Sequence, residues 1–83
     1  MSKLPRDIDG TTLAKYLGKF GYKVVRQTGS HMRLSRVTDN GEQHITIPSH
    51  SPLKIGTLNS ILDGAAIQIG IEKHDLTNLL FGK

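Results

Sequence analysis

The apolar positions near the start of the chain repeat with the period of one helix face. They lie at i, i+3, i+4 and i+7: Leu13, Tyr16, Leu17 and Phe20. Asp9 suits the N-cap of this helix because its carboxylate can accept hydrogen bonds from unpaired N–H groups of the first turn. Gly21 suits the left-handed position that ends a helix. The pattern therefore predicts a helix over about residues 10–20.

Three β-prone segments follow, separated by turn residues. They cover about residues 22–27, 31–37 and 42–47. Gly29 and Ser30 predict the first turn, because glycine readily takes a positive φ and serine can bond nearby backbone. The Asp-Asn-Gly sequence at residues 39–41 predicts a hairpin turn. Pro48 should end the third strand, since proline cannot donate to the ladder.

Alternation within the second and third segments assigns their side chains to two faces of a sheet. The apolar set should face the core: Met32, Leu34, Ile45 and Ile47. The polar set should share one exposed face: His31, Arg33, Ser35, His44 and Thr46. In the first segment two adjacent valines blur the alternation, so the face that Arg26 takes stays open.

The apolar spacing predicts a second helix over about residues 54–69 and a short third helix over about residues 72–80. The inward positions of the longer helix are apolar: Leu58, Ile61, Leu62, Ala65 and Ile69. The order of elements predicts an α+β fold in which helices cover one face of a three-stranded antiparallel sheet. The 83 residues are enough for one domain, residues 1–83, and not for two.

The charge of the chain is uneven. The formal net charge is +4, and residues 15–36 hold six cationic side chains and no acidic one. These are Lys15, Lys19, Lys23, Arg26, Arg33 and Arg36. A cluster of this kind attracts phosphates, which indicates RNA as a partner. The alternative is a solvated basic face with no anionic partner.

The cysteine content and the hydropathy of the chain indicate in which cellular compartment we expect the protein. The chain has no cysteine, which excludes disulfides and thiolate metal sites and agrees with a reducing cytoplasm. No apolar run approaches the roughly 18 residues of a membrane span, so we expect no membrane partner. The N-terminus lacks the apolar stretch of a secretory signal.

His31 is the residue best suited to chemistry. Its predicted position at the start of a strand presents an imidazole beside Arg33 and, across the turn, Arg26. Histidine exchanges protons near neutral pH, and the planar fork of arginine matches phosphate oxygens. Such a pair can cleave RNA through its own 2′-OH without a metal or other cofactor. The residues expected to bind RNA are Arg26, Ser30, Arg33, His44 and Lys54.

A second proton-transfer group is less well defined. His44 is the better candidate because it lies on the predicted exposed face, whereas His50 lies in the loop after Pro48. A zinc site from His31, His44 and His50 is a further alternative. Their spacings of 13 and 6 residues match no compact zinc pattern, so the sequence does not favour a metal site.

Four blocks between residues 13 and 62 carry a family resemblance. In order they are L-x-x-x-L-G-x-F-G-Y, V-R-Q-T-G-S-H, H-I-T-I-P-S-H and K-I-G-T-L-N-S-I-L. The chain resembles, over about residues 4–80, the HicA family of small bacterial toxins, the ribonuclease partners of HicB antitoxins. The resemblance implies the fold of double-stranded-RNA-binding domains (α-β-β-β-α, here with an added C-terminal helix). It also implies that His31, in the Gly-Ser-His block, is catalytic.

Two classes of function follow. The first, which the resemblance favours, is a metal-independent endoribonuclease that cleaves mRNA (an mRNA interferase) as the toxin of a toxin–antitoxin system. A HicB-like antitoxin would bind and neutralise it in a hetero-oligomer. The second is a noncatalytic RNA-binding module of the same fold. Duplex binding by such a module is disfavoured, because residues 49–55 before the second long helix offer only Lys54 as a cation.

Overall fold

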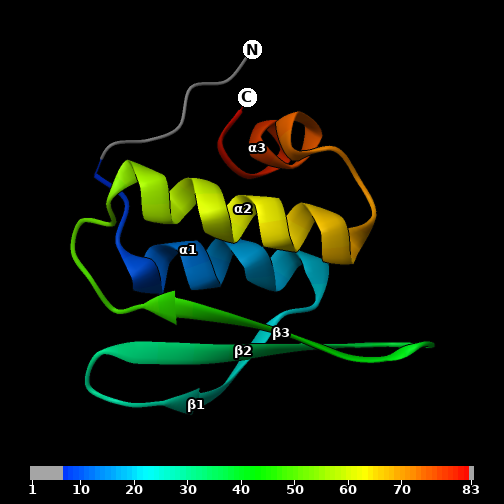
Figure 1. Cartoon of the computed structure of the whole chain (residues 1–83), viewed down its shortest axis with the longest axis horizontal. Coiled ribbons are helices and arrows are strands. Elements are labelled where there is room, and N and C mark those ends of the chain that lie inside the picture. Colours follow the sequence, from blue (N-terminus) through cyan, green and yellow to red (C-terminus); the bar gives the residue numbers. More distant parts are fainter. Residues whose placement is uncertain (1–6, 83) are drawn as a thin grey trace.

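Helices on one side and an open sheet on the other make up the computed structural model, which describes residues 7–82 (Figure 1). The elements in chain order are α1 (Gly10–Leu17), the 3₁₀ helix η1 (Gly18–Phe20), β1 (Lys23–Gln27), β2 (His31–Thr38), β3 (Gly41–Pro48), α2 (Ile55–Ile69) and α3 (Lys73–Phe81). The antiparallel sheet has the order β1-β2-β3, and α1 and α2 lie side by side over one of its faces. The predicted α+β, double-stranded-RNA-binding-domain-like fold is confirmed. None of the helices within residues 7–82 is long and apolar enough to cross a membrane.

The first helical segment covers the predicted residues 10–20, but the α-helix ends at Leu17, residues 18–20 form the 3₁₀ helix η1, and the start is held differently from the prediction. Gly21 has a φ of 94°, the left-handed conformation expected of a helix-ending glycine. Asp9 is the N-cap residue, and its carbonyl accepts the N–H of Leu13 at 3.0 Å. Its carboxylate accepts the Ser51 hydroxyl and makes no bond to the helix, so the predicted side-chain cap is wrong. The same carboxylate instead ties the loop after β3 to the start of α1.

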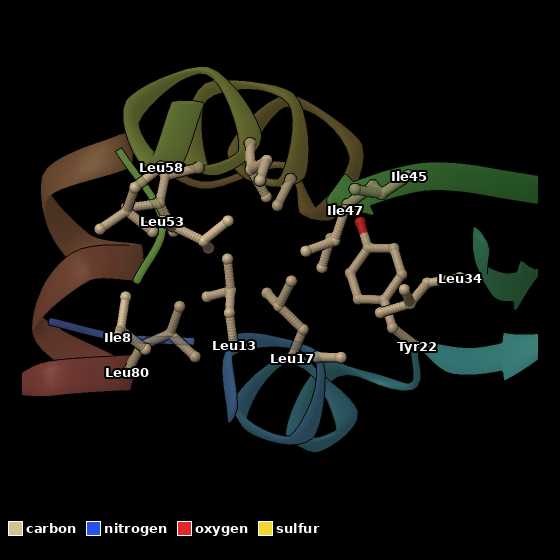
Figure 2. Packing of buried hydrophobic residues seen from close by; sticks show 14 of the residues in the cluster. Ile8, Leu13, Leu17, Tyr22, Leu34, Ile45, Ile47, Leu53, Leu58 and Leu80 are labelled. Carbon is tan, nitrogen blue, oxygen red and sulfur yellow. The ribbon is translucent and has the colours of Figure 1, made fainter. Parts of the chain in front are cut away.

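The core lies between the two helices and the inner face of the sheet (Figure 2). The strand residues predicted to face inward are all buried: Met32, Leu34, Ile45 and Ile47. They meet buried residues of α1 and α2, chiefly Leu13, Leu17, Leu58, Ile61, Leu62 and Ala65. The apolar face of the sheet, predicted from alternation, and the apolar faces of the helices, predicted from helical spacing, therefore pack against each other, as a two-layer arrangement requires.

Arg36 lies inside this two-layer arrangement and not on a free basic surface. Its Nε donates to the carbonyl of Phe20 at 2.8 Å, and its Nη1 donates to Gln43 Oε1 at 2.6 Å and to the Gln68 carbonyl at 3.3 Å. The hydroxyl of Tyr22 donates to Gln68 Oε1 at 2.7 Å. Burial raises the pKa of that hydroxyl above its usual value, while the Arg36 charge acts in the opposite direction. Arg36 thus joins β2 to the ends of η1 and α2.

Ser35 departs from the predicted exposure of its face. Only 6% of it is exposed, although the alternation places it on the outer face with His31 and Arg33. It lies on the central strand, flanked in register by Lys23 on β1 and His44 on β3. Its hydroxyl donates to Glu42 Oε2 at 3.2 Å. The prediction of an exposed Ser35 is wrong because both neighbouring strands cover it.

Gly10 is where two segments approach too closely for a side chain. A Cβ built at this residue would lie 2.0 Å from the carbonyl oxygen of Pro48. The Gly10 N–H donates to the His50 carbonyl at 3.0 Å, and the Leu53 N–H donates to the Ile8 carbonyl at 2.8 Å. The start of α1 and the loop after β3 are therefore joined backbone to backbone. The periodic patterns of the sequence do not predict this close approach.

Candidate functional site

The turn before β2 holds both the N–H and the carbonyl of His31 through Thr28. The Thr28 N–H donates to the His31 carbonyl at 2.9 Å, and the His31 N–H donates to Thr28 Oγ1 at 3.1 Å. Gly29 does not use a positive φ in this turn. The predicted turn is present, but it is held by Thr28 and not by the predicted Gly29 and Ser30. Residue type alone could have indicated this role, since a threonine hydroxyl often bonds the backbone of the turn that follows it.

The ring of His31 is held by its neighbour. Ser30 Oγ lies 2.9 Å from His31 Nδ1, and both residues are exposed. A hydroxyl can donate to this nitrogen or accept from it, so the contact survives when the imidazole gains or loses a proton. Nδ1 is thus engaged by Ser30, and Nε2 is the ring nitrogen that this contact does not use. Ser30, predicted to bind RNA, is placed by the structure to orient His31.

Two arginines face each other across the open side of the sheet. Arg26 on β1 is directly opposite Arg33 on β2, and Thr46 on β3 is the next residue in the same row. A register shift between Val24 and Arg26 brings Arg26 to this face and resolves the ambiguity of the first strand. Like charges directly opposite each other destabilise a sheet. An anion bound between them would relieve that repulsion.

The other predicted cations are dispersed. Lys15 and Lys19 belong to the layer formed by α1 and η1, on the opposite side of the sheet from the arginine row. Arg36 is held within the fold by the contacts described above. Lys23 pairs in register with Ser35 and so shares the open face with the arginines. The expectation of one cluster of six cations is therefore wrong, and three of the six share this face.

The structure does not bring His44 to His31. His44 is exposed on the open face, as predicted, but it is opposite Ser35, four residues along β2 from His31. At about 3.3 Å per residue that separation is roughly 13 Å along the strand. His50 follows Pro48, which pairs with His31. Within residues 7–82 no three His, Asp or Glu side chains gather as a metal site requires, so the zinc alternative gains no support.

Lys54 lies at the start of α2, at the same end of the molecule as His31. It is exposed, immediately precedes α2 and makes no side-chain cap to that helix. The start of α2, the start of β2 and the end of β3 lie at the same end (left in Figure 1). Lys54 and the turn that holds His31 therefore lie toward the same end of the fold.

Comparison with known proteins identifies a family. The family model described as "HicA toxin of bacterial toxin-antitoxin" matches residues 10–71, which is well over half of the chain. No curated protein and no solved structure matches the chain. The matched region includes the turn of His31, the arginine row and the loop that holds His50.

Proposed function

The chain belongs to the HicA toxin family of bacterial toxin–antitoxin systems, and from this premise we propose that it is an endoribonuclease that cleaves mRNA without a metal ion. Residues 1–83 would form one HicA-like domain that acts in the cytoplasm, where mRNA is found. The observation that carries the proposal is the position of His31. Its ring is oriented through Nδ1 by Ser30, on the same sheet face as the row of Arg26 and Arg33.

The proposed chemistry uses the nucleophile that RNA carries. The imidazole of His31 exchanges a proton with the reacting ribose, and the guanidinium of Arg33 holds the phosphate oxygens and offsets their charge. Arg33 is two residues from His31 on one strand, so both side chains leave the same face. Arg26 extends the cationic row toward the neighbouring phosphate. An open face suits a polymer substrate, since the strand of RNA can lie across it.

The arginine row should make RNA binding sensitive to salt. We expect the affinity for single-stranded RNA to fall as salt rises, because neutralised phosphates release counterions. Arg33→Ala should weaken binding and reduce the slope of log affinity against log salt by about 0.7, because the variant neutralises one phosphate fewer. Lys19→Ala is the matched control, because Lys19 is also cationic and exposed but lies in the helical layer. Fluorescence anisotropy at several salt concentrations measures both slopes. An affinity that does not change with salt would exclude the basic face as the binding surface.

We further propose that a HicB-like antitoxin inhibits the protein by covering His31. Steric coverage of the open face is the most economical way to inhibit, because that face carries both His31 and the arginines. Co-expression with the antitoxin encoded beside the toxin should give a stable complex without nuclease activity. In that complex the His31 imidazole should react more slowly with diethyl pyrocarbonate than in the free toxin, whereas the exposed His74 on α3 should react unchanged. A complex in which His31 stays fully reactive would contradict this mode of inhibition.

A further inference from the structure

The pairing of β2 with β3 continues one residue beyond the ends of the strands. His31 is opposite Pro48, the last registered pair. The next residues, Ser30 and Ser49, remain bonded, with the Ser49 N–H donating to the Ser30 carbonyl at 2.8 Å. The chain after Pro48 therefore keeps the direction of β3 for at least one more residue. Ser49 still lies beside the turn that holds His31.

The alternation of side chains also continues through this extension. Ser49 Oγ is buried, without a hydrogen-bond partner among the described residues, so the Ser49 side chain points toward the helices. Its neighbour His50 is exposed. The His50 carbonyl accepts the Gly10 N–H at 3.0 Å, which anchors the backbone of His50 to the start of α1. Continued alternation from Ser49 would put the His50 side chain on the face of the sheet that carries His31.

The register ends at His31 and Pro48, and its extension along the path of Ser49 would make His50 a diagonal neighbour of His31. Residues at i and j+2 of an antiparallel pair lie about 7–8 Å apart, within reach of aromatic and long side chains. His44, by contrast, lies roughly 13 Å along the sheet from His31. In-line cleavage of RNA needs one group at the attacking 2′-oxygen and another at the leaving 5′-oxygen of the same phosphate. The His31–His50 spacing fits a single phosphate, and the His31–His44 spacing does not.

We propose that His50 is the second catalytic residue, the general acid that protonates the leaving 5′-oxygen. The inference rests on the proposed ribonuclease function and adds to it. His31 Nε2 takes the proton of the 2′-OH as the 2′-oxygen forms a bond to phosphorus. The bond from phosphorus to the 5′-oxygen breaks, and that oxygen takes a proton from the His50 imidazolium. The products are a 2′,3′-cyclic phosphate and a 5′-OH, and the two histidines end with their protonation states exchanged.

An RNA with a sulfur leaving group tests this role. A labelled RNA that the wild type cleaves is synthesised again with sulfur in place of the 5′-oxygen at the cleaved bond. A thiolate leaves without protonation, since the pKa of a thiol is about 8.5, so this substrate needs no general acid. His50→Ala should cleave the ordinary RNA about 10²–10⁴-fold more slowly than wild type but cleave the sulfur substrate at nearly the wild-type rate. His31→Ala should be slow on both substrates, and the control His74→Ala, which removes an exposed histidine on α3, should match wild type on both.

Several results would overturn the proposal. Equal cleavage of ordinary RNA by His50→Ala and wild type would remove His50 from the chemistry. Slow cleavage of both substrates by His50→Ala, or rescue of His31→Ala by sulfur, would show that His50 is not the acid. Thermal melts of His50→Ala and His50→Gln test that the fold is kept, as expected because the hydrogen bond that His50 makes to Gly10 uses its backbone carbonyl. If the folded, antitoxin-free wild type cleaves no RNA at all, so that no substrate for the sulfur test can be chosen, the proposed ribonuclease function itself is refuted.

Discussion

Replacing His31 with alanine should remove most of the ribonuclease activity and leave the fold intact. The loss of a general acid or base is expected to lower the cleavage rate by about 10²–10⁴-fold. The free energy of unfolding should change by no more than about 0.5 kcal/mol, as for other surface substitutions. His31 is exposed, and the bonds that Thr28 makes to it use only its backbone, so no cavity is left. RNA binding should persist, because the arginines supply the phosphate contacts.

Single-turnover cleavage of a labelled RNA, with thermal melts of both proteins, measures these effects. His74→Ala is the matched control: it removes another exposed histidine, on α3, whose ring contacts Asp75. Equal cleavage rates for wild type and His31→Ala would remove His31 as a catalytic residue. A His31→Ala protein that does not fold would show that the histidine is structural.

Gly10→Ala should have the largest effect on stability among the glycine substitutions. Its Cβ would lie 2.0 Å from the Pro48 carbonyl oxygen, and the Gly10–His50 hydrogen bond joins the same two backbone segments, so the clash falls on backbone and not on a flexible side chain. Overpacking of this kind typically costs about 1–3 kcal/mol. Gly64→Ala is the matched control, because Gly64 lies inside α2 and a Cβ there meets no atom within 4 Å. That substitution should stabilise the protein by about 0.5–1 kcal/mol, as alanine does relative to glycine inside a helix.

Urea denaturation of wild type and the two variants measures the difference. Gly10→Ala should also cleave RNA more slowly than its remaining folded fraction explains, because the substitution displaces the loop that holds His50. Equal stability of Gly10→Ala and Gly64→Ala would contradict the close approach at Pro48.

The sequence predicted the parts of the fold that follow from regular periods. Alternation along β2 and β3 assigned Met32, Leu34, Ile45 and Ile47 to the core, and all four are buried. On β1 the same reasoning could not place Arg26, because the register shift beside Val24 breaks the alternation. A bulge is set by the pairing of two strands and leaves little trace in one of them.

The order of charged residues along the chain did not predict which of them share a surface in the fold. Arg36 counted toward the cluster between residues 15 and 36, but the even positions of β2 face the helices, and the guanidinium is used there to bond Phe20, Gln43 and Gln68. Asp9 was assigned correctly to the N-cap position, yet its carboxylate bonds Ser51, a residue distant in sequence. Polar side chains such as these bond the partners that the tertiary fold brings near them, and local sequence patterns do not contain that information.

The choice between His44 and His50 as the partner of His31 also depends on information that local sequence patterns lack. Alternation favours His44 because it assigns this residue to the open face, and His44 does lie there. Alternation gives the face of a residue but not its distance along the sheet, which depends on the register of β2 with β3. The register places His31 opposite Pro48, near His50 and far from His44.

Incubation of the purified, antitoxin-free toxin with labelled RNA in EDTA tests the central claim most directly. We expect the wild type to cleave the RNA under single-turnover conditions at a rate that EDTA does not change. The products should end in a 2′,3′-cyclic phosphate and a 5′-OH, and His31→Ala should leave the RNA intact. A folded wild type that binds the RNA and leaves it uncut would contradict the claim and make the protein a noncatalytic RNA-binding module.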